Sequence, residues 1–384
     1  MTLWVPPVIL VVIVGTVLIL AHRPTSQFMF RWLPLPLWCY ALPMIVRQLG
    51  GLPASHPSYA WIIGAFLPIV LALLLLGMDW RAVARVGPNA AAAMTIGAAG
   101  IVVGGPLMFA VFRSWLPPQA WTGIGALAAT WTGGSLNMIA MRSVVGVPDE
   151  IFASLIVVDA LIAYSWMAVL VALSATAPRL DRWLRAASSR TRMHEVPASP
   201  RNAAPRRHRT AVAISVGLAG ALAWACRAVS PLLPIGTLVA SASGWTVLLV
   251  TTCALGLAAV PAVRSMATHG NDLGYAGLYV ILSALGAQAN LAALAAAPVW
   301  VLVGIGTVAI HAVFLLLAGK WLRVPCALLA TASQANVGGV VSAPLVAAVY
   351  DQELAPVGLL LAVAGNAVGT YLGIASALLC RWLR

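Results

Sequence analysis

IFASLIVVDALIAYSWMAVLVAL, from Ile151 to Leu173, is the stretch of sequence that decides the fold. A run of about 20 apolar residues is long enough to cross the hydrocarbon core of a bilayer as a helix. The whole chain of 384 residues shares this character, since 62% of it is hydrophobic and only 8% is charged. Its mean hydropathy of +0.97 is rare among soluble domains. We therefore predict an all-α polytopic membrane protein.

Asp159 is the one charged residue inside this run. A carboxylate at bilayer depth costs at least about 2.5–3.5 kcal/mol on insertion scales, so such residues are usually functional. One interpretation places Asp159 on an ion or proton pathway. The other makes it a buried hydrogen-bond partner that ties two helices together, and the two are compatible.

Twelve apolar runs follow one another along the chain, and from them we expect 11–13 transmembrane helices. The runs lie near residues 3–20, 34–50, 58–78, 88–112, 119–141, 150–177, 211–229, 244–263, 274–292, 296–319, 325–349 and 355–380. An Arg-rich polar stretch divides them, and its composition is typical of a poorly ordered linker. The predicted domains are thus a first transmembrane half (1–177), a linker (178–210) and a second transmembrane half (211–384).

The basic residues gather in that linker. The formal net charge is +13, and nine of the 22 basic residues lie between Arg179 and Arg209. Such a distribution favours contact with the anionic headgroups of membrane lipids and argues against a nucleic-acid partner. The five cysteines show no CxxC spacing, so we expect neither a metal site nor disulfides.

Each half contains a similar Gly-rich segment. The first is GALAATWTGGSLN, from Gly125 to Asn137, and the second is ALLATASQANVGG, from Ala327 to Gly339. Both combine an Ala-Thr pair, a Ser, an Asn and a Gly-Gly pair, which together weaken a helix. Internal repeats with interrupted helices are typical of secondary transporters. Charges flanking the predicted spans favour opposite orientations for the two halves, as inverted repeats require.

We expect the substrate site between these two segments, where unwound backbone can line a cavity. Free N–H groups at the starts of half-helices favour an anionic group. Close packing by small residues is the structural alternative. The predicted substrate-binding residues are Thr130, Gly133, Gly134, Ser135, Asn137, Thr331, Ser333, Gln334, Asn336, Gly338 and Gly339.

Ion coupling is predicted to involve Asp159, Asn366 and His311. Asn366 follows the second Gly-rich segment much as Asp159 follows the first, so a two-fold relation between the halves would bring them together. An Asp-Asn pair can hold one proton or one Na⁺ without repulsion between like charges. His311, inside the run 299–317, is either a proton relay or a satisfied interhelical hydrogen-bond partner.

The motifs Thr130–Asn137 and Ala332–Gly339 resemble the two hallmark motifs of the YjcL-like family of uncharacterised membrane proteins. The resemblance extends over about residues 35–380, including His56–Tyr59, Met78–Arg81, His311 and Gly365–Gly373. Gln334 stands where the family often has Asn, and Val340-Val-Ser replaces a Pro-containing stretch. The resemblance implies membership of the wider cation:proton antiporter and anion transporter superfamily, with inverted repeats and discontinuous helices that cross at the midplane.

The sequence contains no motif for an enzyme or an ATP-driven pump, since HExxH, GxSxG and GxxxxGK[ST] are all absent. We predict a secondary active transporter in the cell inner membrane, without a cofactor. It would move a small organic anion or amino-acid-like solute by alternating access, coupled to H⁺ or Na⁺. The alternatives are a membrane sensor or scaffold that retains the transporter fold and, less favoured, an ion channel. A homodimer is left open.

Overall fold

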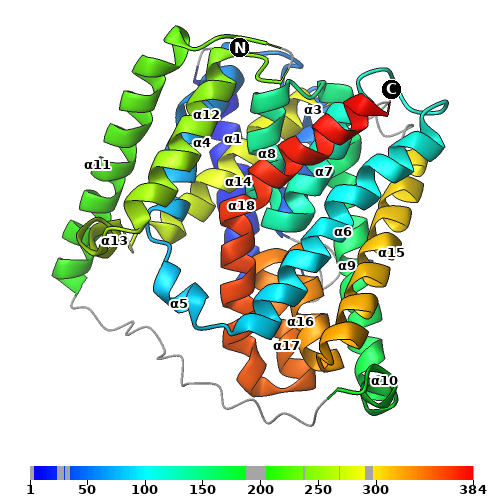
Figure 1. Ribbon diagram of the computed structural model, residues 1–384. Helices are drawn as coiled ribbons and strands as arrows, with labels where there is room; N and C mark the ends of the chain where they lie inside the picture. Colours follow the sequence, from blue (N-terminus) through cyan, green and yellow to red (C-terminus); the bar gives the residue numbers. More distant parts are fainter. Residues whose placement is uncertain are drawn as a thin grey trace. The chain divides into compact units, whose positions relative to one another are not determined.

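Helices account for the regular structure of this chain. The computed structural model describes residues 4–23, 30, 35–186, 205–236, 238–267, 269–289 and 297–383, and no strand occurs among them (Figure 1). The prediction of an all-α protein is confirmed.

Six of the described helical segments are long and apolar enough to span a membrane. They are Pro57–Leu75, Pro88–Phe112, Asp149–Leu184, Thr210–Leu232, Pro298–Leu322 and Gln352–Trp382. Two further helices, Ala242–Ala258 and Pro261–Ala267, pass the same test as a pair bent by 113°. The long helices are fewer than the 11–13 expected, in part because each Gly-rich segment is divided into helices of 11 to 14 residues. The higher count stays a prediction.

The helices form two compact units, and each unit takes segments from both halves of the sequence. The first comprises Met1–Met78, Pro148–Ala160 and Ala204–Ala297, and the second comprises Asp79–Val147, Leu161–Ala203 and Pro298–Arg384. Helix α9 (Asp149–Leu173) contributes its first part to one unit and its second part to the other. This division by contacts is distinct from the predicted division into repeats.

The first unit is held together largely by the packing of helices α4 and α14. Its helices are α1 (Val5–Ala21), α3 (Leu35–Gln48), α4 (Pro57–Leu75), α11 (Pro205–Val229), α12 (Ala242–Ala258), α13 (Pro261–Ala267) and α14 (Asn271–Gln288). Helix α14 packs against α3 and α4. Gly286 allows the closest approach, since a Cβ there would overlap the backbone carbonyl of Tyr40. Arg47 donates hydrogen bonds from Nη1 to the carbonyls of Gln288 (3.2 Å) and Ala289 at the end of α14.

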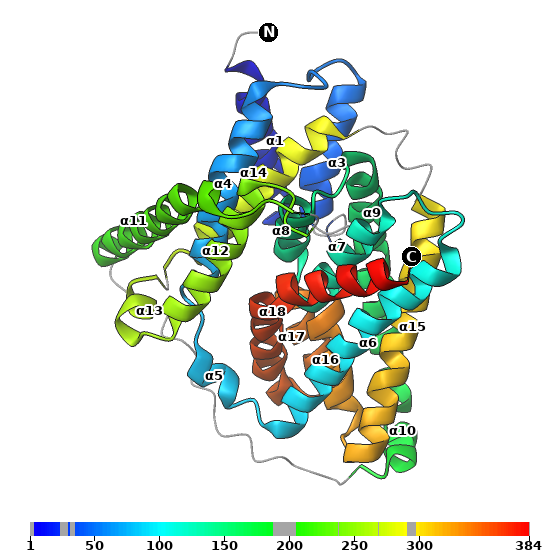
Figure 2. The ribbon, with the colours of Figure 1, turned by 45° about the horizontal axis from the view of Figure 1, so that its top comes forward.

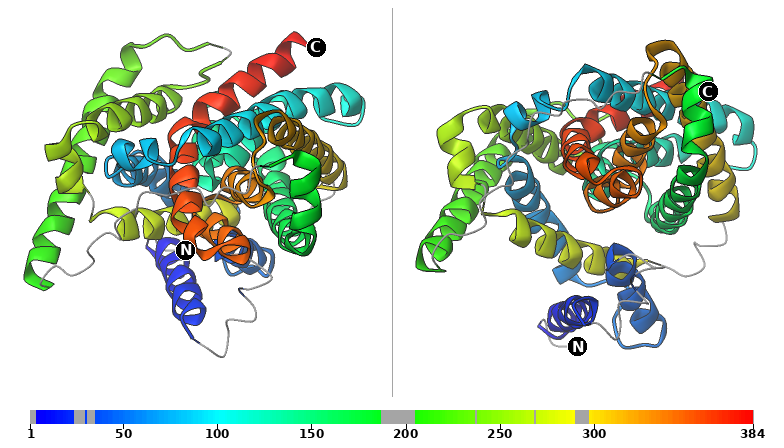
Figure 3. Two further views of the ribbon diagram at one scale, coloured as in Figure 1. Left: turned by 60° about the horizontal axis from the view of Figure 1, so that its bottom comes forward. Right: turned by 90° about the horizontal axis from the view of Figure 1, so that it is seen from below.

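The second unit contains both Gly-rich segments. Its helices are α5 (Trp80–Ala84), α6 (Pro88–Phe112), α7 (Ala120–Gly133), α8 (Ser135–Val145), α10 (Ala177–Leu184), α15 (Ala297–Leu322), α16 (Cys326–Val337), α17 (Gly339–Tyr350) and α18 (Ala355–Trp382). Figure 2 and Figure 3 show α16 and α17 (orange) beside α18 (red), in agreement with the contacts between these helices.

Helices α7 and α18 make the most extensive contact of this unit. Three glycines spaced four residues apart on α18, Gly365, Gly369 and Gly373, face the backbone of α7. A Cβ at Gly369 would lie 2.7 Å from Cα of Gly133, and one at Gly373 would lie 2.6 Å from the carbonyl oxygen of Gly125. Small residues at this spacing let helix backbones approach closely in a membrane.

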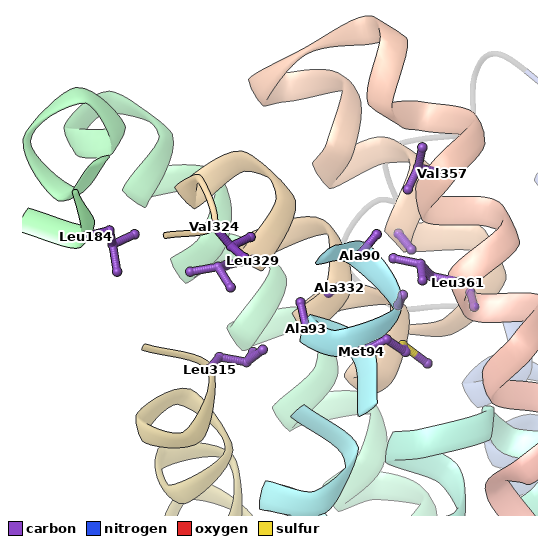
Figure 4. Close-up of a cluster of buried hydrophobic side chains, with 13 residues drawn as sticks. Ala90, Ala93, Met94, Leu184, Leu315, Val324, Leu329, Ala332, Val357 and Leu361 are labelled. Carbon is purple, nitrogen blue, oxygen red and sulfur yellow. The ribbon is translucent and has the colours of Figure 1, made fainter. Parts of the chain in front are cut away.

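A cluster of small and aliphatic side chains packs six helices of this unit together (Figure 4). It brings together α6, α10, α15, α16, α17 and α18 through Ala90, Ala93, Met94, Leu184, Leu315, Val324, Leu329, Ala332, Ala335, Ala343, Val357, Leu361 and Ala362. On the exposed side of α15 the side chains are also apolar, including Leu302, Ile305, Val313 and Leu317. Apolar surface on both sides of a helix is the pattern expected in lipid.

The predicted linker, residues 178–210, is partly helical. Helix α10 covers its beginning, and α11 starts at Pro205 within it. The sequence pattern did not reveal α10 because Pro178, Asp181 and two arginines interrupt its few apolar residues. Residues 187–204 lie outside the described part of the chain.

Candidate site at two interrupted helices

The first Gly-rich segment is interrupted at Gly134. Helix α7 ends at Gly133 and α8 begins at Ser135, while Gly134 between them has φ 77° and ψ 170°. Residues other than glycine rarely adopt a positive φ of this kind. The N–H of Gly134 still donates to the carbonyl of Thr130 (2.6 Å), but no side chain of the described residues caps the start of α8.

The second Gly-rich segment is interrupted at Gly338 and Gly339. Helix α16 ends at Val337 and α17 begins at Gly339, whose φ is 72°. Again no side chain caps the new helix within the part of the chain that the structure describes. Gly338 has an ordinary φ, but a Cβ there would overlap the side-chain amide of Gln334 and the hydroxyl of Ser342. The glycine is needed to make room for these two polar groups.

The two interruptions lie against each other. A Cβ built on Gly339 would come within 3.9 Å of Cα of Gly134. A Cβ on Gly134 would lie 3.3 Å from Oδ1 of Asn366, a half-buried residue of α18. Two uncapped helix N-termini therefore meet at one place, and each carries a partial positive charge and backbone N–H groups. Such a place favours an anion.

Asn137 binds α18 with every polar atom of its side chain. Its Nδ2 donates to the carbonyls of Gly133 (2.5 Å) and Asn366 (3.2 Å). Its Oδ1 accepts from the N–H (3.0 Å) and the hydroxyl (2.6 Å) of Thr370. Because an amide side chain has two donor hydrogens and two main acceptor positions, this one has little capacity left for a ligand. Asn137 positions α8 against α18.

Ser333 and His311 belong to a buried hydrogen-bonded chain. His311 contacts the carbonyl of Gly97 through Nδ1 (2.7 Å) and the hydroxyl of Ser333 through Nε2 (2.9 Å). Trp166 donates from Nε1 to the same hydroxyl (2.8 Å). A carbonyl only accepts, so Nδ1 carries the proton, and in the neutral imidazole Nε2 accepts from Ser333. Every polar atom of the imidazole has a protein partner.

Gln334 and Asn336 each keep one buried oxygen without a donor among the described residues. Gln334 donates from Nε2 to Ser342 (2.9 Å), and its Oε1 has no partner. Asn336 donates from Nδ2 to the carbonyl of Met94 (3.1 Å), and its Oδ1 has no partner. Both side chains are fully buried. Buried acceptors of this kind usually have a donor, a water or an ion as partner.

The remaining predicted residues differ in their surroundings. Thr331 is buried and donates to the carbonyl of Ala327 within its own helix (2.7 Å), so its hydroxyl is directed to the backbone. Thr130 is buried in the last turn of α7, and Ser135 is half-buried at the first position of α8. Asp159 is half-buried in the part of α9 that belongs to the first unit, whereas both Gly-rich segments belong to the second.

Several residues of this arrangement were not predicted. Gly97, Trp166, Ser342 and Thr370 all bind predicted residues. Thr370 had a signal in the sequence, since it lies in the Gly365–Gly373 run of the family resemblance, and Ser342 ends the Val340-Val-Ser stretch that departs from it. Gly97 and Trp166 are single residues whose partners come from other helices.

Comparison with known proteins agrees with the resemblance at the level of the family. Residues 8–383 match the family described as "Protein of unknown function (DUF819)". The chain is also similar to the "Uncharacterized membrane protein YjcL" of Bacillus subtilis (strain 168), with 26% identity over 116 residues. That match covers 30% of this chain and 29% of the Bacillus protein, so the chain spans less than a third of that relative's length in the alignment. With its long apolar helices, the chain is a membrane protein, and it belongs to the DUF819 family.

Proposed function

We propose that this protein is a secondary active transporter for a small organic anion or amino-acid-like solute. The observation that carries the proposal is the contact between Gly134 and Gly339, which brings two interrupted helices together at their uncapped N-termini. Interrupted helices with this geometry bind substrates in transporters because they expose backbone N–H groups at membrane depth.

The two helix starts would bind the anionic group of the substrate. Backbone N–H groups at the beginnings of α8 and α17 supply donors, and the side chains of Ser135 and Asn366 lie at the same place and are half-buried. Because the surroundings have a low dielectric constant, these donors bind an anion more strongly than they would in water.

The unpartnered oxygens on α16 favour a substrate or coupling ion that also carries positive charge. Gln334 Oε1 and Asn336 Oδ1 are acceptors without donors among the described residues. An ammonium group, a protonated acid or Na⁺ would each supply what these oxygens lack. An amino-acid-like zwitterion would thus suit the site better than a simple anion.

Transport would proceed by alternating access, coupled to H⁺ or Na⁺, in the cell inner membrane. Asp159 would carry the coupling ion, with His311 and Asn366 in supporting roles. The neutral, fully bonded His311 fits a structural or relay function better than a direct one. Membership of this protein in the cation:proton antiporter and anion transporter superfamily is part of the same proposal.

The test is transport by purified protein in liposomes. A thermal-shift screen with monocarboxylates, dicarboxylates and amino acids selects the compounds, and counterflow of the labelled compound then measures transport. Asn366→Ala should lower counterflow at least tenfold, equivalent to about 1.4 kcal/mol of lost binding. Asn89→Ala, which changes an exposed Asn of α6, is the matched control. Equal counterflow in both variants would refute the site.

A second candidate is a membrane sensor or scaffold that does not transport. The observation in its favour is that the side chain of Asn137 and the imidazole of His311 are bonded internally, as in a structural core. If no compound that stabilises the purified protein undergoes counterflow, this second candidate replaces the transporter.

A further inference from the structure

Helix α10 joins a basic surface to the beginning of α16. It follows α9 through the turn Ser174–Thr176 and has a buried and an exposed side. On the buried side, Leu184 is fully enclosed in the cluster with Leu329 (Figure 4). A Cβ at Gly319 of α15 would lie 3.1 Å from Leu184, so α10, α15 and α16 are closely packed here.

Asp181 of α10 caps α16. Its Oδ1 accepts a hydrogen bond from the N–H of Cys326, the first residue of α16, over 2.7 Å. The N-cap position itself is Pro325, which offers no side-chain acceptor. A carboxylate at a helix N-terminus also interacts favourably with the helix dipole. The stability of the first turn of α16 therefore depends on the position of α10.

Lys320 provides a second connection. Its ammonium group donates to the carbonyl of Trp183 and lies 4.5 Å from the centroid of the Trp183 ring. Both this contact and the Asp181 cap hold α10 against the ends of α15 and α16. The exposed side of α10 is thus fixed in place.

That exposed side is strongly basic. We define the α10 basic face as Arg179, Arg182, Arg185, Lys320 and Arg323. Its four arginines are exposed, and the nearest acid in sequence, Asp181, is already engaged with Cys326. Two exposed aromatic residues, Trp183 and Trp321, lie among these cations in the sequence. Arginine with exposed tryptophan at the ends of apolar helices is typical of the membrane–water interface.

We propose that the α10 basic face binds the headgroups of anionic phospholipids and that this binding stabilises the beginning of α16. Arginine guanidinium groups bind phosphate oxygens in a bidentate manner, and a negatively charged leaflet attracts clustered cations. Bound headgroups would hold α10 in the position at which Asp181 caps Cys326. The lipid would thereby act on the helix that carries Ser333, Gln334 and Asn336, whatever the substrate is.

The experiment compares protein in nanodiscs of pure phosphatidylcholine with protein in nanodiscs that also contain phosphatidylglycerol. Hydrogen exchange of the peptide that covers Cys326–Thr331 is the readout. In the wild-type protein, phosphatidylglycerol should slow exchange of this peptide several-fold. In Arg179→Gln/Arg182→Gln the effect should disappear, and in Arg179→Lys/Arg182→Lys most of it should remain.

The matched control is Arg81→Gln/Arg113→Gln, which removes the same charge from two separate exposed positions. This variant should respond to phosphatidylglycerol as the wild type does. An equal loss in both Gln variants, or no response in the wild type, would overturn the proposal. So would full protection by inorganic phosphate in phosphatidylcholine nanodiscs, because the surface would then bind free phosphate.

Asp181→Ala separates lipid binding from its transmission to α16, because it removes the oxygen that accepts from the Cys326 N–H. This variant should still bind phosphatidylglycerol, as measured by native mass spectrometry of the retained lipid, but should lose the protection of Cys326–Thr331. If the protection survives in Asp181→Ala, the cap does not connect the lipid to α16 and the proposed coupling is wrong.

Discussion

Gly134 and Gly339 lie against each other although they come from opposite halves of the sequence, and both have a positive φ. Each occupies the point at which one helix ends and another begins. The contact therefore places two backbone turns and two helix N-termini within one small region of the second unit. Its properties can be tested residue by residue.

The first prediction concerns the two neighbouring glycines of the second interruption. Gly339→Ala should lower the free energy of unfolding by about 1–2 kcal/mol, because an L-residue at this φ is strained. Gly338→Ala should instead displace the Gln334 amide and raise the KM for transport, since the new Cβ occupies its place. In a Gln334→Ala/Ser342→Ala background, which removes both polar groups that the new Cβ would overlap, the effect of Gly338→Ala should largely vanish. If the two substitutions behave alike, the assigned backbone conformations are wrong.

The second prediction compares the two asparagines of the Gly-rich segments, Asn137 after the first Gly-Gly pair and Asn336 before the second. Asn137→Ala removes four hydrogen bonds and leaves the N–H and hydroxyl of Thr370 without the acceptor they share. It should therefore destabilise the protein by about 2–4 kcal/mol. Asn336→Ala removes one bond and an unpartnered oxygen, and it should cost about 1 kcal/mol or less. Thermal unfolding in one detergent measures both, and the reverse order would contradict the hydrogen-bond assignment.

The third prediction concerns the protonated nitrogen of His311. Nitrogen NMR of labelled protein at neutral pH should show the neutral Nδ1–H tautomer, because the carbonyl of Gly97 requires a donor. Ser333→Ala should leave the proton on Nδ1 but shift the Nε2 resonance, since Nε2 then loses its partner. If the neutral ring of the wild type instead carries its proton on Nε2, the series of hydrogen bonds from Trp166 through Ser333 and His311 to Gly97 is wrong.

The fourth prediction tests energy coupling through Asp159. In liposomes with imposed H⁺ or Na⁺ gradients, Asp159→Asn should abolish accumulation while exchange of substrate without a gradient continues. The reason is that the amide can neither release a proton nor attract a cation with a full charge. Unchanged accumulation that still depends on pH or Na⁺ would leave Asp159 with a structural role.

The sequence predicted the interruptions better than the contacts of the residues around them. Both helices end at the predicted Gly-Gly pairs because glycine and the neighbouring polar residues weaken helices locally, which is a property of the segment itself. By contrast, each segment contributes one Asn, yet both polar atoms of the Asn137 side chain bind α18, whereas Asn336 keeps an oxygen without a partner among the described residues. Their partners come from other helices, so the motif could not distinguish them.

The number of membrane crossings was less predictable for a related reason. Helix breaks, bends and glycines shorten apolar helices, so a run of apolar residues need not be one long helix. At Val260 and its neighbours an apolar run bends by 113° between α12 and α13. Helix α10 was not predicted because its sequence is mostly polar. Only Leu180 and Leu184, which lie between charged residues, mark the side that packs into the cluster.

The glycine contact between α7 and α18 has a mechanical consequence. At Gly125, Gly133, Gly369 and Gly373 the helices touch through backbone, and backbone has no side-chain rotamers with which to absorb a displacement. Sliding of α18 along its axis would therefore push α7 directly. Because α7 ends beside Gly134, we expect a displacement of α18 to reach the helix interruption through backbone contacts alone.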